Sequence, residues 1–184
     1  RFAAGDLQGK DLTKVLRAAN AVDGAPVHLD DNGYHTLASI RSLARSLHAR
    51  HHQEGGLALV VVDYLQLISP PASRPRESNR TNEVSEIARG LKLLARELEV
   101  PVVALSQLNR SVETRADGIP TLADLRESGE IEQAADAVIL LSREEMRDPE
   151  TDRLGICDAN VAKNRQGPTG TVELHFAGEY TRFS

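Results

Sequence analysis

The chain has 184 residues, of which 40% are hydrophobic and 3% aromatic, and its formal net charge is −5. This acidic balance argues against a general polyanion-binding surface, because non-specific nucleic-acid affinity rises with the phosphates that Lys and Arg neutralise. The scarcity of aromatic residues also argues against a platform on which successive bases stack. Any contact with nucleic acid is therefore expected to be local and made mainly to its backbone.

Length and hydrophobic pattern predict one compact cytoplasmic domain over residues 1–184. No apolar run approaches the roughly 18 residues that suggest a membrane span, and no charged-then-apolar leader precedes a cleavage site, so no membrane contact is expected. Cys157, the single cysteine, lies in an alternating apolar run and has no internal partner for a disulfide or a zinc site. We expect it to be a buried strand residue.

The N-terminal part of the chain predicts two helices. The first covers 9–22, and residues 25–30 after it are expected to form a short edge strand. Thr36 is the expected N-cap of the second helix, because its hydroxyl can accept a backbone N–H and apolar residues then recur at helical spacing as far as Leu47. The Gly55-Gly56 pair ends this helix.

Two continuous apolar runs flank the clearest helix of the chain. Residues 57–62 and 101–105 are rich in β-branched side chains, which is typical of parallel strands covered on both faces. Between them, 70–81 is rich in Pro, Ser and Arg and predicts a mobile loop. Asn82 is then expected to cap a helix whose apolar residues keep helical spacing as far as Leu98.

A third apolar run at 137–141 follows a short helix predicted at 122–126. Strands that alternate with helices in this way indicate an α/β fold, with a central, mostly parallel sheet flanked by helices.

Residues 156–184 differ in character and predict a C-terminal antiparallel hairpin. Alternating strands are expected at 156–162 and 171–176, joined by a turn that contains Gly167-Pro168. A last short strand is expected at 180–183.

Polar residues directly follow three of the predicted strands. Ligands of parallel α/β sheets bind at the carboxyl ends of the strands, so these are the candidate site residues. Asp63 follows the first run, Ser106 and Gln107 follow the second, and Lys163 and Arg165 lie at the end of a late strand. A carboxylate in the first position suits a Mg²⁺ ion that bridges nucleotide phosphates, although a single Asp there can equally cap a turn.

Four ordered groups of motifs resemble the DnaB family of hexameric replicative helicases. They are Asp63-Tyr-Leu-Gln-Leu67 with Leu105-Ser-Gln-Leu-Asn-Arg110, Asp124-Leu-Arg-Glu-Ser-Gly129 with Ile131-Glu-Gln133, Ala162-Lys-Asn-Arg-Gln-Gly-Pro168, and Gly178-Glu-Tyr-Thr-Arg-Phe183. The resemblance covers essentially the whole chain. It implies a RecA-like P-loop NTPase core, ATP and Mg²⁺ as ligands, and ATP-dependent unwinding of duplex DNA by translocation on one strand, with hydrolysis at subunit interfaces.

The resemblance also implies roles for individual residues. Asp63 would serve the magnesium site, and Gln107 would sense the terminal phosphate of ATP from the adjacent strand end. Lys163 and Arg165, on what we call the finger hairpin, would reach the ATP of a neighbouring subunit and stabilise charge on the transferring phosphoryl group. Outside this family context, an isolated Gln usually satisfies loop backbone, and a basic hairpin is usually a polar turn.

Arg126, Glu127 and Gly129 fall where the channel loop of the family touches single-stranded DNA. Arginine can bind a phosphate oxygen, and glycine lets a backbone N–H approach closely. Glu127 would repel phosphate, so we expect it to orient Arg126 or a loop of a neighbouring subunit. The alternative is the solvated end of a surface helix.

The sequence contains no G-x-x-x-x-G-K-[ST] stretch, which the family places upstream of these residues together with its catalytic glutamate. That loop provides much of the phosphate grip, so the chain alone is expected to bind ATP weakly and hydrolyse it poorly. We expect the sequence to be part of a longer helicase. A derivative without a motor would have little use for Asp63, Lys163 and Arg165.

The implied partners are single-stranded DNA, further copies of the chain in a homohexamer of the full-length protein, a primase and a helicase loader. Two other hypotheses stay open. One is a RecA-like recombination or repair ATPase, which would form filaments instead of closed rings. The other is a catalytically degenerate assembly module, which would lack a phosphate loop in the parent protein.

Overall fold

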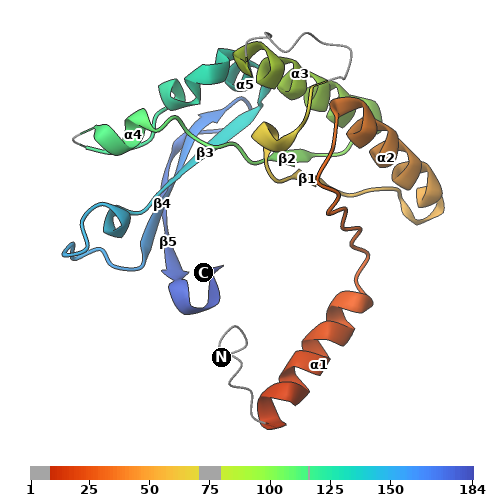
Figure 1. Cartoon of the computed structure of the whole chain (residues 1–184), viewed down its shortest axis with the longest axis horizontal. Helices are drawn as coiled ribbons and strands as arrows, with labels where there is room; N and C mark the ends of the chain where they lie inside the picture. Colours follow the sequence, from red (N-terminus) through yellow and green to blue (C-terminus); the bar gives the residue numbers. More distant parts are fainter. Residues whose placement is uncertain (1–8, 71–79, 116) are drawn as a thin grey trace. The chain divides into compact units, whose positions relative to one another are not determined.

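The structure is a computed structural model that describes residues 9–70, 80–115 and 117–184 (Figure 1). The described residues divide between Gly33 and Tyr34 into two separately compact units. Most of the loop predicted at 70–81 lies outside the described residues. The elements are, in chain order, α1 (Gly9–Asp23), α2 (Leu37–Arg50), η1 (His52–Glu54), β1 (Val60–Val62), η2 (Leu65–Leu67), α3 (Arg80–Leu98), β2 (Val102–Ala104), α4 (Ser111–Thr114), η3 (Leu122–Ser128), α5 (Gly129–Ala134), β3 (Ala137–Ser142), η4 (Glu144–Met146), β4 (Ile156–Asn164), β5 (Gly170–Ala177), η5 (Gly178–Tyr180) and β6 (Arg182–Phe183).

In the first unit, α1 confirms the helix predicted at 9–22. The edge strand predicted at 25–30 is wrong, because these residues have no strand structure. The Val27 N–H donates to the Ala25 carbonyl at 2.7 Å, which closes a tight local turn. A strand also needs a partner ladder, and Pro26 cannot donate to one.

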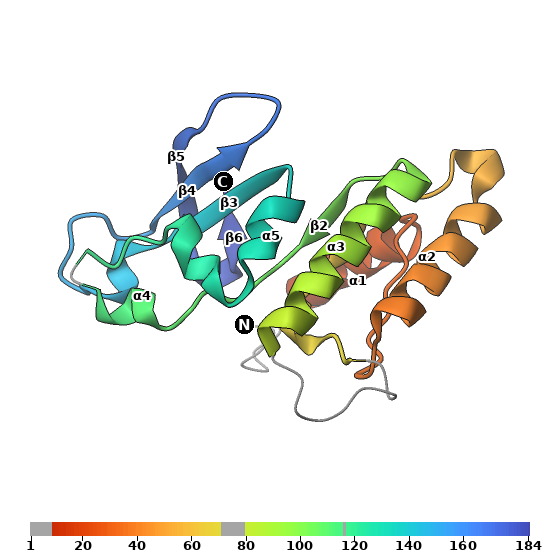
Figure 2. The same ribbon diagram turned by 90° about the horizontal axis from the view of Figure 1, so that it is seen from above.

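In the second unit, α2 and α3 pack side by side (Figures 1 and 2). Thr36 caps α2 as predicted: its hydroxyl accepts the Ser39 N–H at 3.2 Å, and the Ser39 hydroxyl accepts the Thr36 N–H at 3.0 Å. This is a capping box, which satisfies two N–H groups at the start of the helix. The predicted cap Asn82 is wrong, because α3 already begins at Arg80 and Asn82 lies within its first turn.

Side chains of α2, α3 and the η2 segment form the larger of two cores among the described residues. Its buried members are Ala44, Leu65, Ile68, Val84, Ile87, Leu91 and Leu94. On the outside, the Glu97 carboxylate of α3 binds Arg45 at 2.6 Å and Arg41 at 3.3 Å, both from α2. The apolar residues whose spacing predicted these two helices are therefore the residues that pack in this core.

The described strands form two sheets. β1 and β2 pair in parallel, whereas β3 pairs antiparallel with β4, and that sheet continues through β5 to β6. The predicted α/β class is confirmed, but the third predicted strand belongs to the antiparallel sheet, so among the named strands of the described residues only β1 and β2 pair in parallel. The long alternating strand β4 pairs with β3 from Ala137 to Ser142, with one register shift between Val138 and Ile139, and the apolar character of β3 could not reveal this partner.

The parallel sheet has one covered face and one open face. Val62 and Val102 pack against the larger core, while Val61 and Val103 are 57% and 50% exposed. The sequence predicted that both faces of this sheet would be covered, but in the described residues the face that carries Val61 and Val103 is open. β1 and β2 are also shorter than the apolar runs that predicted them, since only the paired residues form a ladder.

The C-terminal hairpin is formed by β4 and β5, as predicted, and β6 continues the sheet. Cys157 on β4 is buried as expected, and this burial raises the pKa of its thiol. None of the helices that the structure describes is both long enough and apolar enough to cross a membrane.

Candidate functional site

The carboxyl ends of β1 and β2 bring Asp63 and Gln107 to one edge of the parallel sheet. Strand pairing continues past both ends, because the Leu105 N–H donates to the Val62 carbonyl and the Leu65 N–H to the Leu105 carbonyl, each at 2.9 Å. Asp63 comes directly after β1, Gln107 comes three residues after the end of β2, and both are exposed. The two segments thus leave neighbouring strands side by side, as the sequence predicts.

Gln66 in η2 ties these two strand ends together. Its Nε2 donates to the Ser106 hydroxyl at 3.0 Å and to the Gln107 carbonyl at 3.3 Å, and its Oε1 accepts the Gln107 N–H at 3.3 Å. The backbone of Gln107 is therefore held on both sides by one amide. Sequence reasoning missed this role, because the partners lie 40 and 41 residues apart and leave no local pattern.

The side chains at this edge are of the chemical types that can bind Mg²⁺ together with a nucleotide. No ion pair engages the Asp63 carboxylate within the described parts of the chain, and no three His, Cys, Asp or Glu side chains there gather around a common metal position. Mg²⁺ is usually held by one or two carboxylates and takes its other ligands from phosphates and water. One available carboxylate beside amide groups is such a donor set.

Lys163 and Arg165 both contact the C-terminal end of α5. Lys163 Nζ donates to the Glu132 carbonyl, and Arg165 Nη2 donates to the Gln133 carbonyl at 2.7 Å. The Arg165 N–H also donates to the Asp136 carbonyl at 2.9 Å. Lys163 and Arg165 lie on one side of the strand end, as expected. Both side chains, however, contact α5 of their own chain. The Arg165 side chain stays 52% exposed.

Asp136, between α5 and β3, interacts with the positive charges of Lys92, Lys163 and Arg165. Its carboxylate forms an ion pair with Lys92 of α3, and Arg165 Nη1 lies 3.9 Å from its Oδ1. The hydrogen bond from Lys92 holds the pKa of Asp136 below its usual range, and the charges of Arg165 and Lys163 act in the same direction. Sequence reasoning missed Asp136 and Lys92, which are 44 residues apart.

The three residues predicted to contact DNA lie in consecutive elements. Arg126 and Glu127 are in η3, and Gly129 begins α5. The side chains of Arg126 and Glu127 are outside the described part of the structure. The short helix predicted at 122–126 is confirmed by η3, which continues directly into α5.

An ion pair whose carboxylate is buried anchors the start of η3. The Asp124 carboxylate binds Arg115 and accepts the Thr121 N–H at 2.7 Å and the Thr121 hydroxyl at 2.9 Å. Arg115 in turn holds the pKa of Asp124 below its usual range. The Asp124 carbonyl also accepts the Asn109 N–H at 3.0 Å, so the segment after Gln107 is tied directly to η3.

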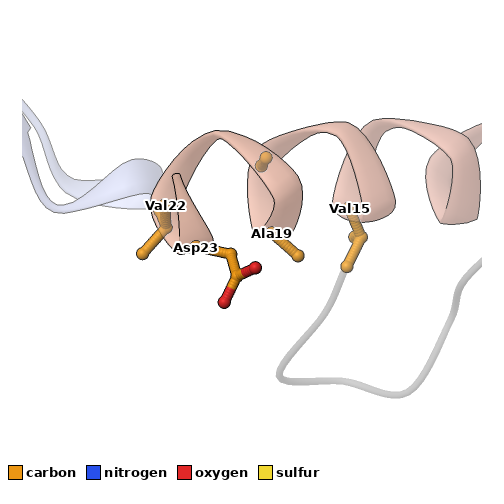
Figure 3. Close-up of a pocket in the computed structure, with 5 residues that line it drawn as sticks. Val15, Ala19, Val22 and Asp23 are labelled. Atoms are coloured by element: carbon orange, nitrogen blue, oxygen red, sulfur yellow. The ribbon is translucent and has the colours of Figure 1, made fainter. Parts of the chain in front are cut away.

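A hollow along α1 has a different chemistry (Figure 3). It is lined by Val15, Ala18, Ala19, Val22 and Asp23. Four aliphatic side chains and one carboxylate offer no donor for a phosphate, so this surface does not share the properties of the strand ends.

Comparison with known proteins shows relatives along the whole chain. The family model described as the DnaB-like helicase C terminal domain matches residues 1–184. The replicative DNA helicase DnaB of Leifsonia xyli subsp. xyli is 48% identical over 180 residues, which cover 98% of this chain and 38% of the relative. The corresponding helicase of Geobacillus stearothermophilus is 46% identical over 179 residues, covering 97% and 38%. The chain thus spans well under half the length of these relatives.

Solved structures agree with these sequence matches. A DnaB-like replicative helicase, solved to study its interactions with primase, superposes with a TM-score of 0.87 at 39% identity, covering 97% of this chain and 41% of that one. A second solved structure, described as an ATPase domain, superposes with a TM-score of 0.88 at 40% identity, covering 98% and 62%. The RecA-like fold expected from the motifs is confirmed, and the chain belongs to the family of DnaB-like helicase C-terminal domains.

Proposed function

We propose that this chain is part of the motor of an ATP-driven replicative DNA helicase. The observation that supports the proposal is the edge of the parallel sheet where Asp63 and Gln107 emerge together, tied by Gln66, in a chain that matches the DnaB family throughout. A carboxylate for the metal and an amide for the terminal phosphate are two groups that an ATPase of this class needs.

At this edge, Asp63 would hold Mg²⁺, which neutralises charge on the nucleotide phosphates. The Gln107 amide can accept from a water and donate to a phosphate oxygen, so its hydrogen bonds differ between ATP and ADP states. The bond between the Asn109 N–H and the Asp124 carbonyl gives such a difference a short route to η3. Gln107 would thereby report the state of the nucleotide to the DNA-contacting segment.

Lys163 and Arg165 would act on the ATP of a neighbouring subunit in a homohexameric ring. Arg165 uses one N–H for the Gln133 carbonyl, and a guanidinium has five donors in a fixed plane. The donors that remain can stabilise charge on the phosphoryl group that is transferred.

Arg126 and Gly129 would contact the phosphates of single-stranded DNA, and Glu127 would orient Arg126. The net charge of −5 supports such a local contact, since the chain as a whole is not basic. We also propose a primase as a partner. The interaction with primase of the DnaB-like helicase that superposes on this chain supports this.

The proposal is tested by Arg165→Ala in the full-length parent protein. We expect the loss of DNA-stimulated ATP hydrolysis by roughly 10³-fold or more, because an arginine finger stabilises the transition state. The binding of ATP should stay largely intact. Steady-state ATPase rates with and without single-stranded DNA, and titration with a fluorescent ATP analogue, measure the two quantities.

Arg50→Ala is the matched control, because Arg50 is an exposed arginine at the end of α2 and should be silent. Equal loss of ATP binding and hydrolysis in Arg165→Ala would show a structural role for Arg165 instead. Helical filaments in place of closed six-fold rings, seen by electron microscopy of the parent protein, would contradict the ring.

A further inference from the structure

Helix α5 joins two parts of the proposed motor. Its first residue, Gly129, is one of the residues proposed to contact DNA, and Arg126 and Glu127 lie just before it in η3. Its last turn supplies the carbonyls of Glu132 and Gln133, which Lys163 and Arg165 bind. A helix of six residues is only about 9 Å long and has continuous backbone bonding, so a shift at one end reaches the other.

Asp136 lies just beyond this helix and links three elements. Its carbonyl accepts the Arg165 N–H at 2.9 Å, and its carboxylate lies 3.9 Å from the Arg165 guanidinium. The same carboxylate pairs with Lys92 on α3, which lies beside α5 in both views (Figures 1 and 2). The finger hairpin, the end of α5 and the long helix α3 therefore meet at one side chain.

The contacts of Arg165 fix the orientation of its guanidinium as well as its position. Nη2 is bound to the Gln133 carbonyl, and Nη1 faces the Asp136 carboxylate. Because the guanidinium is planar and rigid, two such contacts set the direction in which its other N–H groups point. The Gln133 carbonyl is neutral and would accept from any donor, whereas the carboxylate of Asp136 attracts a cation specifically.

We infer that Asp136 is a positioning residue that keeps Arg165 seated against α5, so that movement of the DNA-contacting segment is transmitted to the finger. Lys92 holds the carboxylate in place from α3. This inference rests on the proposed roles of Arg165 and of the segment before α5. Asp136 itself need touch neither nucleotide nor DNA.

The exposure of this ion pair makes it suitable for mutation. The side chains of Lys92 and Asp136 are 30% and 54% exposed. Exposed pairs contribute little to folding stability, because water screens them. Replacing either residue therefore tests the geometry around Arg165 with little risk of unfolding the domain.

The test is Asp136→Asn in the full-length hexameric protein, with Lys92→Met as a second variant. We expect the stimulation of ATPase kcat by single-stranded DNA to fall about fivefold or more in both, the range typical of coupling between sites. The KM for ATP, the Kd for single-stranded DNA and ring assembly should stay unchanged. Asp136→Glu, which keeps the charge, should retain more stimulation than Asp136→Asn.

Asp152→Asn is the control, since Asp152 is an exposed carboxylate in the segment before β4 and should leave the stimulation unchanged. Full stimulation in both Asp136→Asn and Lys92→Met would overturn the inference. So would a joint loss of ATP binding, DNA binding and assembly, which would indicate a structural role.

Arg165→Ala measured in parallel separates this inference from the proposed function. If Arg165→Ala abolishes stimulation while the Asp136 and Lys92 variants keep it, only the coupling role of Asp136 fails. If Arg165→Ala itself keeps full stimulation, the proposed role of Arg165 fails, and the coupling role fails with it.

Discussion

Asp124 shows how one enclosed charge organises its surroundings. Its side chain is 3% exposed, and donors from Arg115 and Thr121 replace the water that a carboxylate would otherwise bind. A buried anion is tolerated only with such compensation, and the removal of one partner leaves the others unsatisfied. Since Asp124 lies in the first turn of η3, the same bonds that stabilise the fold position the proposed DNA contact.

Asp124→Asn should lower the free energy of unfolding at pH 7 by roughly 1 to 3 kcal/mol, because the amide cannot replace the charged hydrogen bond from Arg115. The pKa of Asp124 is lowered in the folded state, so its contribution is fully present above the unfolded value of about 3.9 and is lost as the pH falls through the folded pKa. Urea unfolding at several pH values measures the difference, which should shrink below about pH 4. A difference that stays constant with pH would contradict this account.

Single residues were predictable where the chemistry follows from position along the chain. Asp63 and Gln107 could be found because Asp63 directly follows a recognisable strand and Gln107 lies within three residues of the end of another. Gln66, Asp136 and Lys92 could not be found, since each acts through partners far away along the chain and nothing nearby marks it. Contacts of this kind are set by packing, which a local pattern does not encode.

Helices α2 and α3 approach closely at Gly90. A Cβ atom at this position would lie 2.2 Å from Leu37 Cδ2 and 2.9 Å from Leu37 Cδ1. In an open helix, replacing glycine by alanine stabilises by about 0.5 to 1 kcal/mol, because less backbone entropy is lost on folding. Here the overlap with Leu37, which packs against the core, acts against that gain.

Gly90→Ala should therefore destabilise the protein, by about 1 to 2 kcal/mol, as overpacking of a core does. In a Leu37→Ala background the overlap is removed, and the same substitution should be neutral or stabilising. Urea unfolding of the two single variants and the double variant gives both differences. A rise in stability from Gly90→Ala alone would show that the Leu37 side chain can move aside at no cost.

Elements were predictable where one face of a periodic segment is buried. Helical spacing identified α2 and α3, and apolar runs identified β1, β2 and β3. The strand predicted at 25–30 was wrong, because apolar residues around a proline resemble a strand whether or not a partner strand exists. The antiparallel pairing of β3 with β4 was missed for a related reason, because the residues of one strand do not determine which other strand it pairs with.

The proposed catalytic groups lie on different sheets of the whole molecule. Asp63 and Gln107 follow the parallel strands, while Lys163 and Arg165 belong to the end of β4 in the antiparallel sheet. In the proposed ring, the first pair belongs to the subunit that binds ATP and the second pair to its neighbour. Each subunit of a ring would then contribute to two different interfaces, which a heterologous, closed arrangement permits.

The most direct test of this division mixes two inactive variants of the full-length protein, Asp63→Asn and Arg165→Ala, within the same rings by co-expression. Each variant alone should lack DNA-stimulated ATPase. In random equal mixtures about a quarter of the interfaces pair an intact Asp63 with an intact Arg165, so activity should return to roughly that fraction of wild type. Mixed rings that stay as inactive as the separate variants would contradict the claim that Arg165 completes the site of a neighbouring subunit.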